Sequence, residues 1–328
     1  MDGPTADARH RASILLLSWR DAAFIEEAVR GALAQTVACE IVVSNDASGD
    51  ATHERASALL AGYEGPHSVK VRCNERNLGV AAHVSATVPL TRGEIIVMMA
   101  GDDVSVPHRV ERVLQAFDAN PGVMALASQF DAIDAEGRPV ELHLPFRRER
   151  FGLDYFVSSG RLMGLLGATL AFRREVFDRF GPIRGPIEDN ALSLRAALLG
   201  DCLKLREPLV RYRQHSGSVS ADVFAKSGSK DDAKRRRYQR TIDFYRGTAD
   251  DLEHCLAQLP DLPETRRRLA RDILAMYRIE ADARAAMLDA PRMAWIGPIL
   301  RGLGQRGLRR KSAERALKLL LPRRFVGV

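Results

Sequence analysis

The chain of 328 residues contains few cysteines and no long hydrophobic run. Its four cysteines, at positions 39, 73, 202 and 255, form no Cys-x-x-Cys pair, which excludes a zinc ribbon and a thioredoxin-type redox motif. No segment approaches the roughly 20 apolar residues of a membrane-spanning helix. The polar residues 1–11 contain no apolar core of a secretory signal. These absences predict a cytoplasmic protein, soluble or peripheral, whose cysteines are buried small hydrophobic residues.

Three common catalytic motifs are also missing. No Walker loop, no Gly-x-Gly-x-x-Gly after the first apolar run and no Gly-x-Ser-x-Gly elbow occur. Their absence argues against P-loop NTPases, Rossmann dehydrogenases and serine hydrolases. The hydrophobic content of 46% and charged content of 28% are those of an ordinary globular protein.

Basic residues are concentrated in the last third of the chain. Residues 1–225 contain 25 Lys and Arg against 29 Asp and Glu, a net charge of −4. Residues 226–328 contain 24 against 13, a net charge of +11. The overall charge of +7 therefore describes the C-terminal region, which is where an anionic partner is expected.

Hydrophobic patterning predicts an α/β fold for residues 1–225. Strands are expected at 13–18, 40–44, 69–72, 93–100 and 203–210, and helices at 22–36, 51–61, 79–88, 107–119, 174–180 and 188–199. Asp21 is expected to cap the first helix, and the charged stretch 146–156 to be a loop. This alternation is typical of a mostly parallel sheet flanked by helices. Strand signals then disappear, and helices at 231–258, 263–289 and 308–320 predict a separate α-helical C-terminal region over 226–328.

Two polar turns directly follow buried strands, where parallel α/β sheets bind ligands. Asp102 and Asp103 come after the strand ending at position 100. Adjacent carboxylates repel one another unless a cation lies close by, so they could hold Mg²⁺ or Mn²⁺. A solvated turn capping the next helix explains them equally well. In the turn 45–50, Asp46 could bind a ribose or a base edge, although an Asx turn needs no ligand.

Two further acids and a histidine are candidates. Glu188 and Asp189 begin a predicted helix, where acids are favoured by the helix dipole even without a catalytic role. His215, next to Ser216 and Ser218, follows the last predicted strand, and a lone histidine is usually structural. None of these residues identifies a function alone.

Taken in order, the motifs resemble those of the family 2 glycosyltransferases of the GT-A fold. The matching segments are SILLLSWR at 13–20, FIEEAV at 24–29, AQT at 34–36, EIVVSNDASGD at 40–50, NLG at 77–79, GDD at 101–103, ED at 188–189 and YRQHSGS at 212–218. The resemblance covers about residues 12–220. It implies a Rossmann-like, mostly parallel sheet and an inverting, metal-dependent transfer of a sugar from a nucleotide-diphosphate donor to an acceptor hydroxyl.

The resemblance also implies residue roles. Asp189 would be the general base, with Glu188 orienting it, and Asp102 would hold Mn²⁺ or Mg²⁺, with His215 as a further metal or phosphate ligand. The donor, with a UDP-sugar favoured, would be bound by Asp46, Ser18, Asn77 and Asp103. Ala100 stands where the family's Asp-x-Asp-Asp motif begins, and Asn45 replaces another aspartate, which puts the choice of base in doubt. A nucleotidyltransferase and a degenerate sugar-nucleotide-binding scaffold stay as alternatives.

The basic C-terminal region has three possible roles. It could be a helical cap on the core, a contact with an anionic membrane, or a nucleic-acid site, which is not favoured because no known module accompanies it. Apolar residues at 293–303 precede the basic run 309–311, and leucines at 317–321 precede Arg323 and Arg324. This pattern suits an interfacial membrane contact. A lipid-linked or glycan acceptor in bacterial surface-glycan synthesis, such as O-antigen, would lie at the inner face of the plasma membrane.

Overall fold

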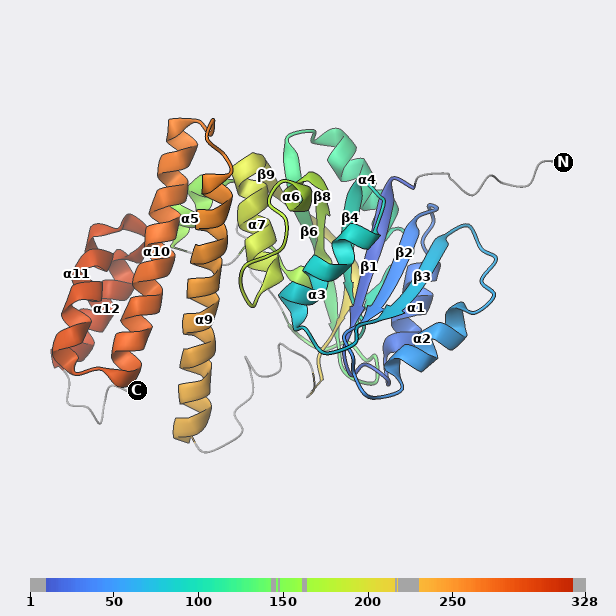
Figure 1. The fold of residues 1–328 in the computed structure, drawn as a ribbon, viewed down its shortest axis with the longest axis horizontal. Helices are drawn as coiled ribbons and strands as arrows, with labels where there is room; N and C mark the ends of the chain where they lie inside the picture. Colours follow the sequence, from blue (N-terminus) through green and yellow to red (C-terminus); the bar gives the residue numbers. More distant parts are fainter. Residues whose placement is uncertain are drawn as a thin grey trace.

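The computed structural model describes residues 10–142, 146, 148–160, 164–215, 217 and 230–320, without the side chains of 230–234 and 320. Within these residues, a helix-flanked sheet occupies one part of the molecule and a group of helices lies at the other end (Figure 1). The predictions that involve Ser216, Ser218, Leu321, Arg323 and Arg324 concern positions outside the described residues.

One mixed sheet contains all nine strands of the described residues, in the order β3-β2-β1-β4-β8-β6-β9-β5, with β7 also pairing with β9. The strands are β1 (Ala12–Ser18), β2 (Glu40–Asn45), β3 (Ser68–Cys73), β4 (Ile95–Ala100), β5 (Val104–Ser105), β6 (Val123–Ile133), β7 (Arg150–Phe151), β8 (Leu170–Arg173) and β9 (Asp201–Arg213). Strands β3, β2, β1 and β4 are parallel, as are β6 and β9. The predicted α/β architecture is confirmed, and β8 enters it antiparallel to both neighbours.

Seven α-helices of the described residues precede the C-terminal region. They are α1 (Ile25–Leu33), α2 (Thr52–Leu60), α3 (Val80–Thr87), α4 (Arg109–Ala119), α5 (Leu153–Ser159), α6 (Glu175–Asp178) and α7 (Glu188–Leu199). The prediction that Asp21 caps the first helix is wrong, because α1 begins at Ile25 and the Asp21 carboxylate accepts a hydrogen bond from the Trp19 N–H instead. The loop predicted at 146–156 is also wrong, since β7 and α5 bury Phe151, Leu153 and Phe156 in the core.

The predicted C-terminal helices are confirmed as α9 (Lys230–Ala257), α10 (Glu264–Asp289) and α12 (Arg309–Leu320). Sequence analysis missed α11 (Ile296–Gly304), which follows the short 3₁₀ turn η3 (Arg292–Trp295). Sequence analysis interpreted Pro298 as a break. It is the third residue of α11, in the first turn, where a proline removes no intrahelical hydrogen bond. Among the described residues, no helix combines the length and apolar character needed to cross a bilayer.

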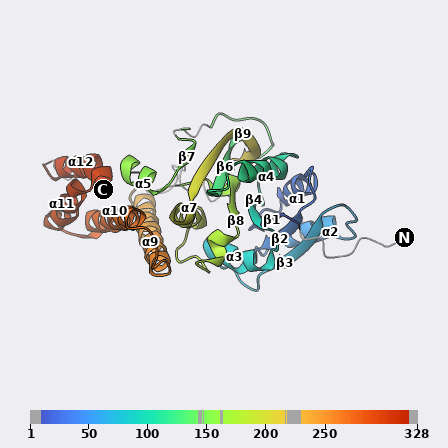
Figure 2. The same ribbon diagram turned by 90° about the horizontal axis from the view of Figure 1, so that it is seen from above.

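The sheet separates two hydrophobic clusters, because successive side chains of a strand point to opposite faces. On β1, Leu15 belongs to one cluster, whereas Ile14 and Leu16 belong to the other. Burial on both faces explains why residues 14–17 of this strand are all apolar. Helices α1, α2 and α4 cover one face and α3 and α7 the other (Figure 2), and α5 adds its apolar residues to the cluster of α3 and α7. The cluster that contains α3, α5 and α7 also contains residues of α9 and α10. It therefore joins residues on both sides of the predicted boundary at 225/226. The boundary itself lies outside the described residues.

A buried ion pair connects α7 to α9. The Arg195 guanidinium donates two hydrogen bonds to the Asp251 carboxylate, at 2.6 and 2.9 Å. Both side chains are almost fully buried, at 1% and 2% exposure. Helix α7 also carries the acids Glu188 and Asp189, so this pair ties a candidate catalytic helix to the C-terminal region.

We expect Asp251→Asn to lower the free energy of unfolding by about 3–5 kcal/mol, because it leaves a buried guanidinium without its counter-charge. The matched control is Glu253→Gln on the same helix, which breaks the exposed Arg278–Glu253 pair and should cost under about 1 kcal/mol. Urea unfolding monitored by circular dichroism measures both. Equal effects of the two substitutions would contradict this account.

Candidate active site

The carboxyl ends of β1, β2 and β4 lie side by side. Ser18 is paired with Asn45 across β1 and β2, and Leu17 with Ala100 across β1 and β4. The turns that follow these strands therefore meet at one edge of the sheet. Arg20 and Ala47 in these turns have positive φ angles of 61° and 51°. Such strained backbone is found at functional sites more often than elsewhere.

Asp46 and Asn77 come together in this edge, as the sequence analysis expected of donor-binding residues. The Asp46 side chain is buried, at 2% exposure, and accepts hydrogen bonds from Asn74 Nδ2 at 2.6 Å and the N–H groups of Leu78 and Gly79 at 2.9 Å. Asn77 Nδ2 donates to the Asp46 carbonyl at 3.2 Å. In this structure the Asp46 carboxylate thus holds the turn that leads into α3.

Ser18 and Asp21 both lie close to Gly101, and sequence analysis missed Asp21 as a site residue. A Cβ atom at Gly101 would come within 2.5 Å of Asp21 Oδ2 and 2.7 Å of the Ser18 Cβ, so only glycine fits there. Asp21 is buried at 8% exposure. Burial and the nearby Asp102 charge raise the pKa of Asp21 to about 7. The only signal in the sequence was an acid shortly after the first strand, which equally suggested a helix cap.

Asp102 and His215 form the centre of the site. Their Oδ2 and Nε2 atoms are 3.1 Å apart although 113 residues separate them in the chain. The side chains are 17% and 13% exposed, so each can still meet a ligand. The Gly217 N–H donates to His215 Nδ1 at 3.2 Å, which leaves Nε2 facing the carboxylate. The Phe24 ring packs against the imidazole, with ring centroids 4.6 Å apart.

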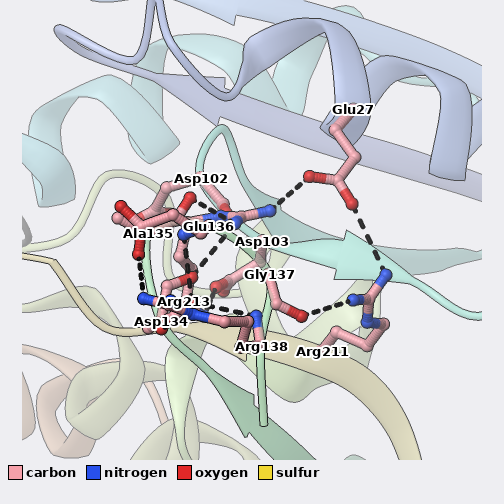
Figure 3. A network of polar contacts seen from close by, with 10 residues as sticks. All are labelled: Glu27, Asp102, Asp103, Asp134, Ala135, Glu136, Gly137, Arg138, Arg211 and Arg213. Carbon is pink, nitrogen blue, oxygen red and sulfur yellow. Dashed lines mark hydrogen bonds and ion pairs between the residues drawn. The ribbon is translucent and has the colours of Figure 1, made fainter.

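Asp103 points into the protein and belongs to a network around Arg213 (Figure 3). Its Oδ1 accepts the Arg213 N–H at 2.8 Å. The Arg213 guanidinium, itself 1% exposed, donates to the Asp102 carbonyl at 2.8 Å, to the carbonyls of 134–135 and to Glu27. Burial, reinforced by the Asp102 charge, raises the pKa of Asp103 well above its usual value. Arg213, which sequence analysis did not single out, therefore fixes the backbone of the acid pair.

The ligating atoms of Asp102 and His215 suit a metal ion that substrate oxygens also help to bind. Asp102 supplies a carboxylate oxygen and His215 an imidazole nitrogen, but within the described ranges no cluster of three or more His, Cys, Asp or Glu side chains could hold a metal ion. Mg²⁺ and Mn²⁺ are commonly bound by one or two protein ligands together with phosphate oxygens and water. The residues therefore suit a shared ion and not an all-protein cage.

Glu188 and Asp189 begin α7 and are partly buried. The Gly167 N–H donates to Asp189 Oδ2 at 3.3 Å, and a Cβ atom at Gly167 would lie 2.9 Å from Glu188 Oε1. Burial raises the pKa of Asp189 to about 6. Burial and the Asp189 charge raise the pKa of Glu188 to about 8. Two neighbouring acids with raised pKa values are suited to proton transfer near neutral pH.

Arg109 links the two groups of acids. This fully buried side chain donates to the Met98 carbonyl of β4 at 2.7 Å and to the Ala168 carbonyl at 3.3 Å. Met98 lies near the end of the strand that leads to Asp102, and Ala168 directly follows the glycine that contacts Asp189. Sequence analysis missed Arg109, because nothing in a helical arginine predicts burial.

Comparison with known proteins places these features in a family. The profile of Glycosyl transferase family 2 matches residues 13–181, more than half of the chain. The protein is a glycosyltransferase of the GT-A fold, and it belongs to Glycosyl transferase family 2. The resemblance drawn from the motifs is thus confirmed.

Two curated relatives are also similar in sequence. An uncharacterized glycosyltransferase of Nostoc sp. is 25% identical over 231 residues, which cover 68% of this chain and 70% of the relative. The succinoglycan biosynthesis protein ExoO of Rhizobium meliloti is 29% identical over 143 residues, 43% of this chain and 39% of that protein.

Two solved structures share the fold at low sequence identity. TarS residues 1–349 from S. aureus, in complex with UDP-GlcNAc, has a TM-score of 0.54 and 14% identity, covering 93% of this chain and 92% of that one. The mannosyltransferase PcManGT from Pyrobaculum calidifontis, in complex with GDP-Man and Mn²⁺, has a TM-score of 0.54 and 15% identity, covering 97% and 87%. At this identity the likeness concerns the fold.

Proposed function

We propose that the protein transfers a sugar from a nucleotide-diphosphate donor to an acceptor hydroxyl, with inversion at the anomeric carbon and with a divalent metal ion. The observation that carries this proposal is the Asp102–His215 pair, 3.1 Å apart at the carboxyl edge of the sheet. The partly buried acids at the start of α7 support it, because they supply a base of raised pKa. Family membership favours this reaction over nucleotidyl transfer and over a degenerate scaffold.

Asp102 and His215 would hold Mn²⁺ or Mg²⁺ together with the donor's phosphate oxygens. The metal would offset the negative charge that builds up on the leaving diphosphate. Arg213 keeps Asp102 and Asp103 in place through the hydrogen bonds described above. We assign the nucleoside end of the donor to the turns that contain Ser18, Asp46 and Asn77. Asp46 would act there largely by holding the turn 77–79.

Asp189 would be the general base. The acceptor oxygen attacks the anomeric carbon from the face opposite the diphosphate, the bond to the diphosphate oxygen breaks, and the acceptor proton moves to the Asp189 carboxylate. Burial and the Asp189 charge raise the pKa of Glu188, and in its protonated form Glu188 would donate a hydrogen bond that orients Asp189 or the acceptor.

We expect kcat/KM to fall as the pH drops below about 6, because protonation of Asp189 removes the base. The sign follows from the chemistry, since only the ionised carboxylate can accept the acceptor's proton. The matched control is Glu188→Gln, which should keep an acid limb, because Asp189 is still present as the group whose protonation removes the base. A profile that stays flat between about pH 5 and about pH 8 would contradict the assignment.

The donor and pathway are narrower proposals. A relative takes part in succinoglycan biosynthesis, and the structural neighbours bind UDP-GlcNAc and GDP-Man. We propose a role in bacterial polysaccharide synthesis, such as that of O-antigen, with a UDP-sugar as donor and a lipid-linked glycan as acceptor at the inner face of the membrane. GDP-mannose is the main rival donor.

A thermal-shift screen of UDP- and GDP-sugars tests the donor and the metal together. The proposal predicts that one UDP-sugar raises the Tm and that the increase grows when Mn²⁺ is added, because a ligand that binds only the folded state stabilises it. Stabilisation by a GDP-sugar alone would overturn the choice of donor. Stabilisation by no sugar nucleotide, with or without Mn²⁺, would overturn the proposed function.

A further inference from the structure

The outward side of α11 is apolar and uncovered in the described part of the chain. Four side chains along η3 and α11 are exposed: Met293 at 76%, Ile296 at 38%, Leu300 at 62% and Leu303 at 38%. Their spacing of three and four residues places them on one face. We call them the outer α11 stripe. An exposed apolar stripe of this size marks an interaction site more often than chance placement does.

The inward side of the same segment packs against α10 and α12. Trp295 and Ile299 are buried, at 6% and 5% exposure, in a small cluster with Met287 of α10. Gly302 packs so closely on α12 that a Cβ atom would lie 2.1 Å from Ser312 Oγ. The outer α11 stripe is therefore not needed to pack the helix against the rest of the protein. The helix is apolar on both its inward and its outward side. A helix of this kind is normally covered on both sides.

The surroundings of the stripe are strongly basic. Residues 292–320 contain eight Lys and Arg against a single acid, Glu314. Some of these charges are neutralised, as in the Arg301–Asp282 and Arg315–Glu280 pairs. Arg306 and Lys318 form no ion pair with any residue that the structure describes. Arg310 is paired with Glu314 at 3.0 Å, but its side chain is still 93% exposed. On the adjoining α12, Leu317 adds another apolar side chain, at 63% exposure.

We propose that the outer α11 stripe inserts into the interface of an anionic lipid bilayer, with Arg306, Arg310 and Lys318 contacting the headgroups. Apolar side chains next to basic ones bind such surfaces through burial and charge together. A second copy of the chain would bring two equally basic segments together, and a nucleic acid would leave the stripe exposed. The inference rests on the proposed function only in that a lipid-linked acceptor would lie at the same surface.

The stripe is remote from the catalytic edge of the sheet. In both views, α11 and α12 lie at the end of the molecule opposite β3, beyond α9 and α10 (Figures 1 and 2). The surface therefore acts as a tether and contributes no residue to the reaction. Membrane binding and donor binding can consequently be lost separately, which makes the two proposals separable by experiment.

Co-sedimentation of the full chain with vesicles tests the proposal. The wild type should bind vesicles of phosphatidylcholine with phosphatidylglycerol more tightly than vesicles of phosphatidylcholine alone. The double variant Met293→Gln/Leu300→Gln should lose about tenfold or more in affinity, because two side chains no longer favour insertion. Arg306→Gln/Lys318→Gln should weaken binding to the anionic vesicles only. The matched control is Leu90→Gln, at a leucine that is 43% exposed and outside the C-terminal region.

The outcomes separate this inference from the proposed function. All variants should keep the wild-type thermal shift with the sugar nucleotide and Mn²⁺, which shows that they are folded. No binding of the wild type to anionic vesicles, or equal losses for Leu90→Gln and the double variant, would overturn the tether while leaving the enzyme proposal intact. A concentration-dependent dimer that the double variant abolishes, without vesicle binding, would assign the stripe to a second copy instead.

Discussion

Replacing Asp189 by asparagine is expected to lower the turnover of sugar transfer by about 10²–10⁴-fold, because the amide cannot accept the acceptor's proton. The substitution is nearly isosteric and keeps an oxygen that can accept the Gly167 N–H. The structure around α7 should therefore survive. Donor affinity should change little, since the donor is assigned to the turns after β1, β2 and β4. Steady-state kinetics with the sugar nucleotide, together with its Kd, separates the two effects.

Glu188→Gln is the matched control for this prediction. Burial and the Asp189 charge raise the pKa of Glu188 and so favour its neutral form, so a neutral amide at this position should preserve much of the activity. A loss of turnover larger in Glu188→Gln than in Asp189→Asn would reverse the roles of the two acids. Near wild-type turnover in Asp189→Asn would remove Asp189 as the base.

Replacing Asp102 by asparagine should abolish the dependence of nucleotide binding on Mn²⁺ and lower turnover by about 10²–10³-fold. The amide cannot supply the negative charge that the divalent ion requires, and it leaves His215 without its carboxylate partner. The backbone should be little affected, because Arg213 bonds the Asp102 carbonyl and not its side chain. Isothermal titration of UDP with and without Mn²⁺ measures the effect on binding.

Asp118→Asn provides the control for Asp102→Asn. Asp118 is an exposed aspartate paired with Arg11, and its replacement should leave the metal dependence unchanged. If wild-type protein bound UDP with equal affinity in the presence and absence of Mn²⁺, Asp102 would have no role as a metal ligand.

Local sequence patterns predicted β1, β2, β3, β4 and β9 but not β5, β7 and β8, and they predicted that the polar turns meet at the carboxyl ends of the strands. The predicted strand at 13–18 matches β1 within one residue, because burial on both faces makes its central residues 14–17 all apolar. Asp46 follows β2 and Asp102 follows β4, the parallel strands on either side of β1, so topology places their turns at the same edge of the sheet. Only the family motif predicted that His215 belongs to the same site, because 113 residues separate it from Asp102 in the chain.

The residues that sequence analysis missed depend on tertiary contacts. Arg213 and Arg109 are charged side chains buried at 1% exposure, a state that no local pattern predicts because arginine is normally exposed. The burial of Asp21 follows from its closeness to Gly101. The predicted strand at 203–210 is longer at both ends in β9, because pairing with β6 runs from Asp201 to Arg213, with β7 paired near its start and β5 near its end.

The uneven distribution of charge along the chain does not mark a separately packed unit. The predicted boundary at 225/226 lies where basic residues begin and strand signals end. The hydrophobic cluster nevertheless joins α7, α9 and α10, and the buried Arg195–Asp251 pair reinforces that contact. The excess positive charge is concentrated around α11 and α12 and away from the catalytic edge.

Identifying the products formed from a sugar nucleotide in the presence of Mn²⁺ tests the central claim most directly. The donor found in the thermal-shift screen is incubated with the protein, and the released nucleotide is separated by ion-exchange chromatography. The account predicts a nucleoside diphosphate and a free or transferred sugar, formed only with the metal and lost in Asp102→Asn. Release of pyrophosphate, or equal product formation by wild type and Asp102→Asn, would contradict it.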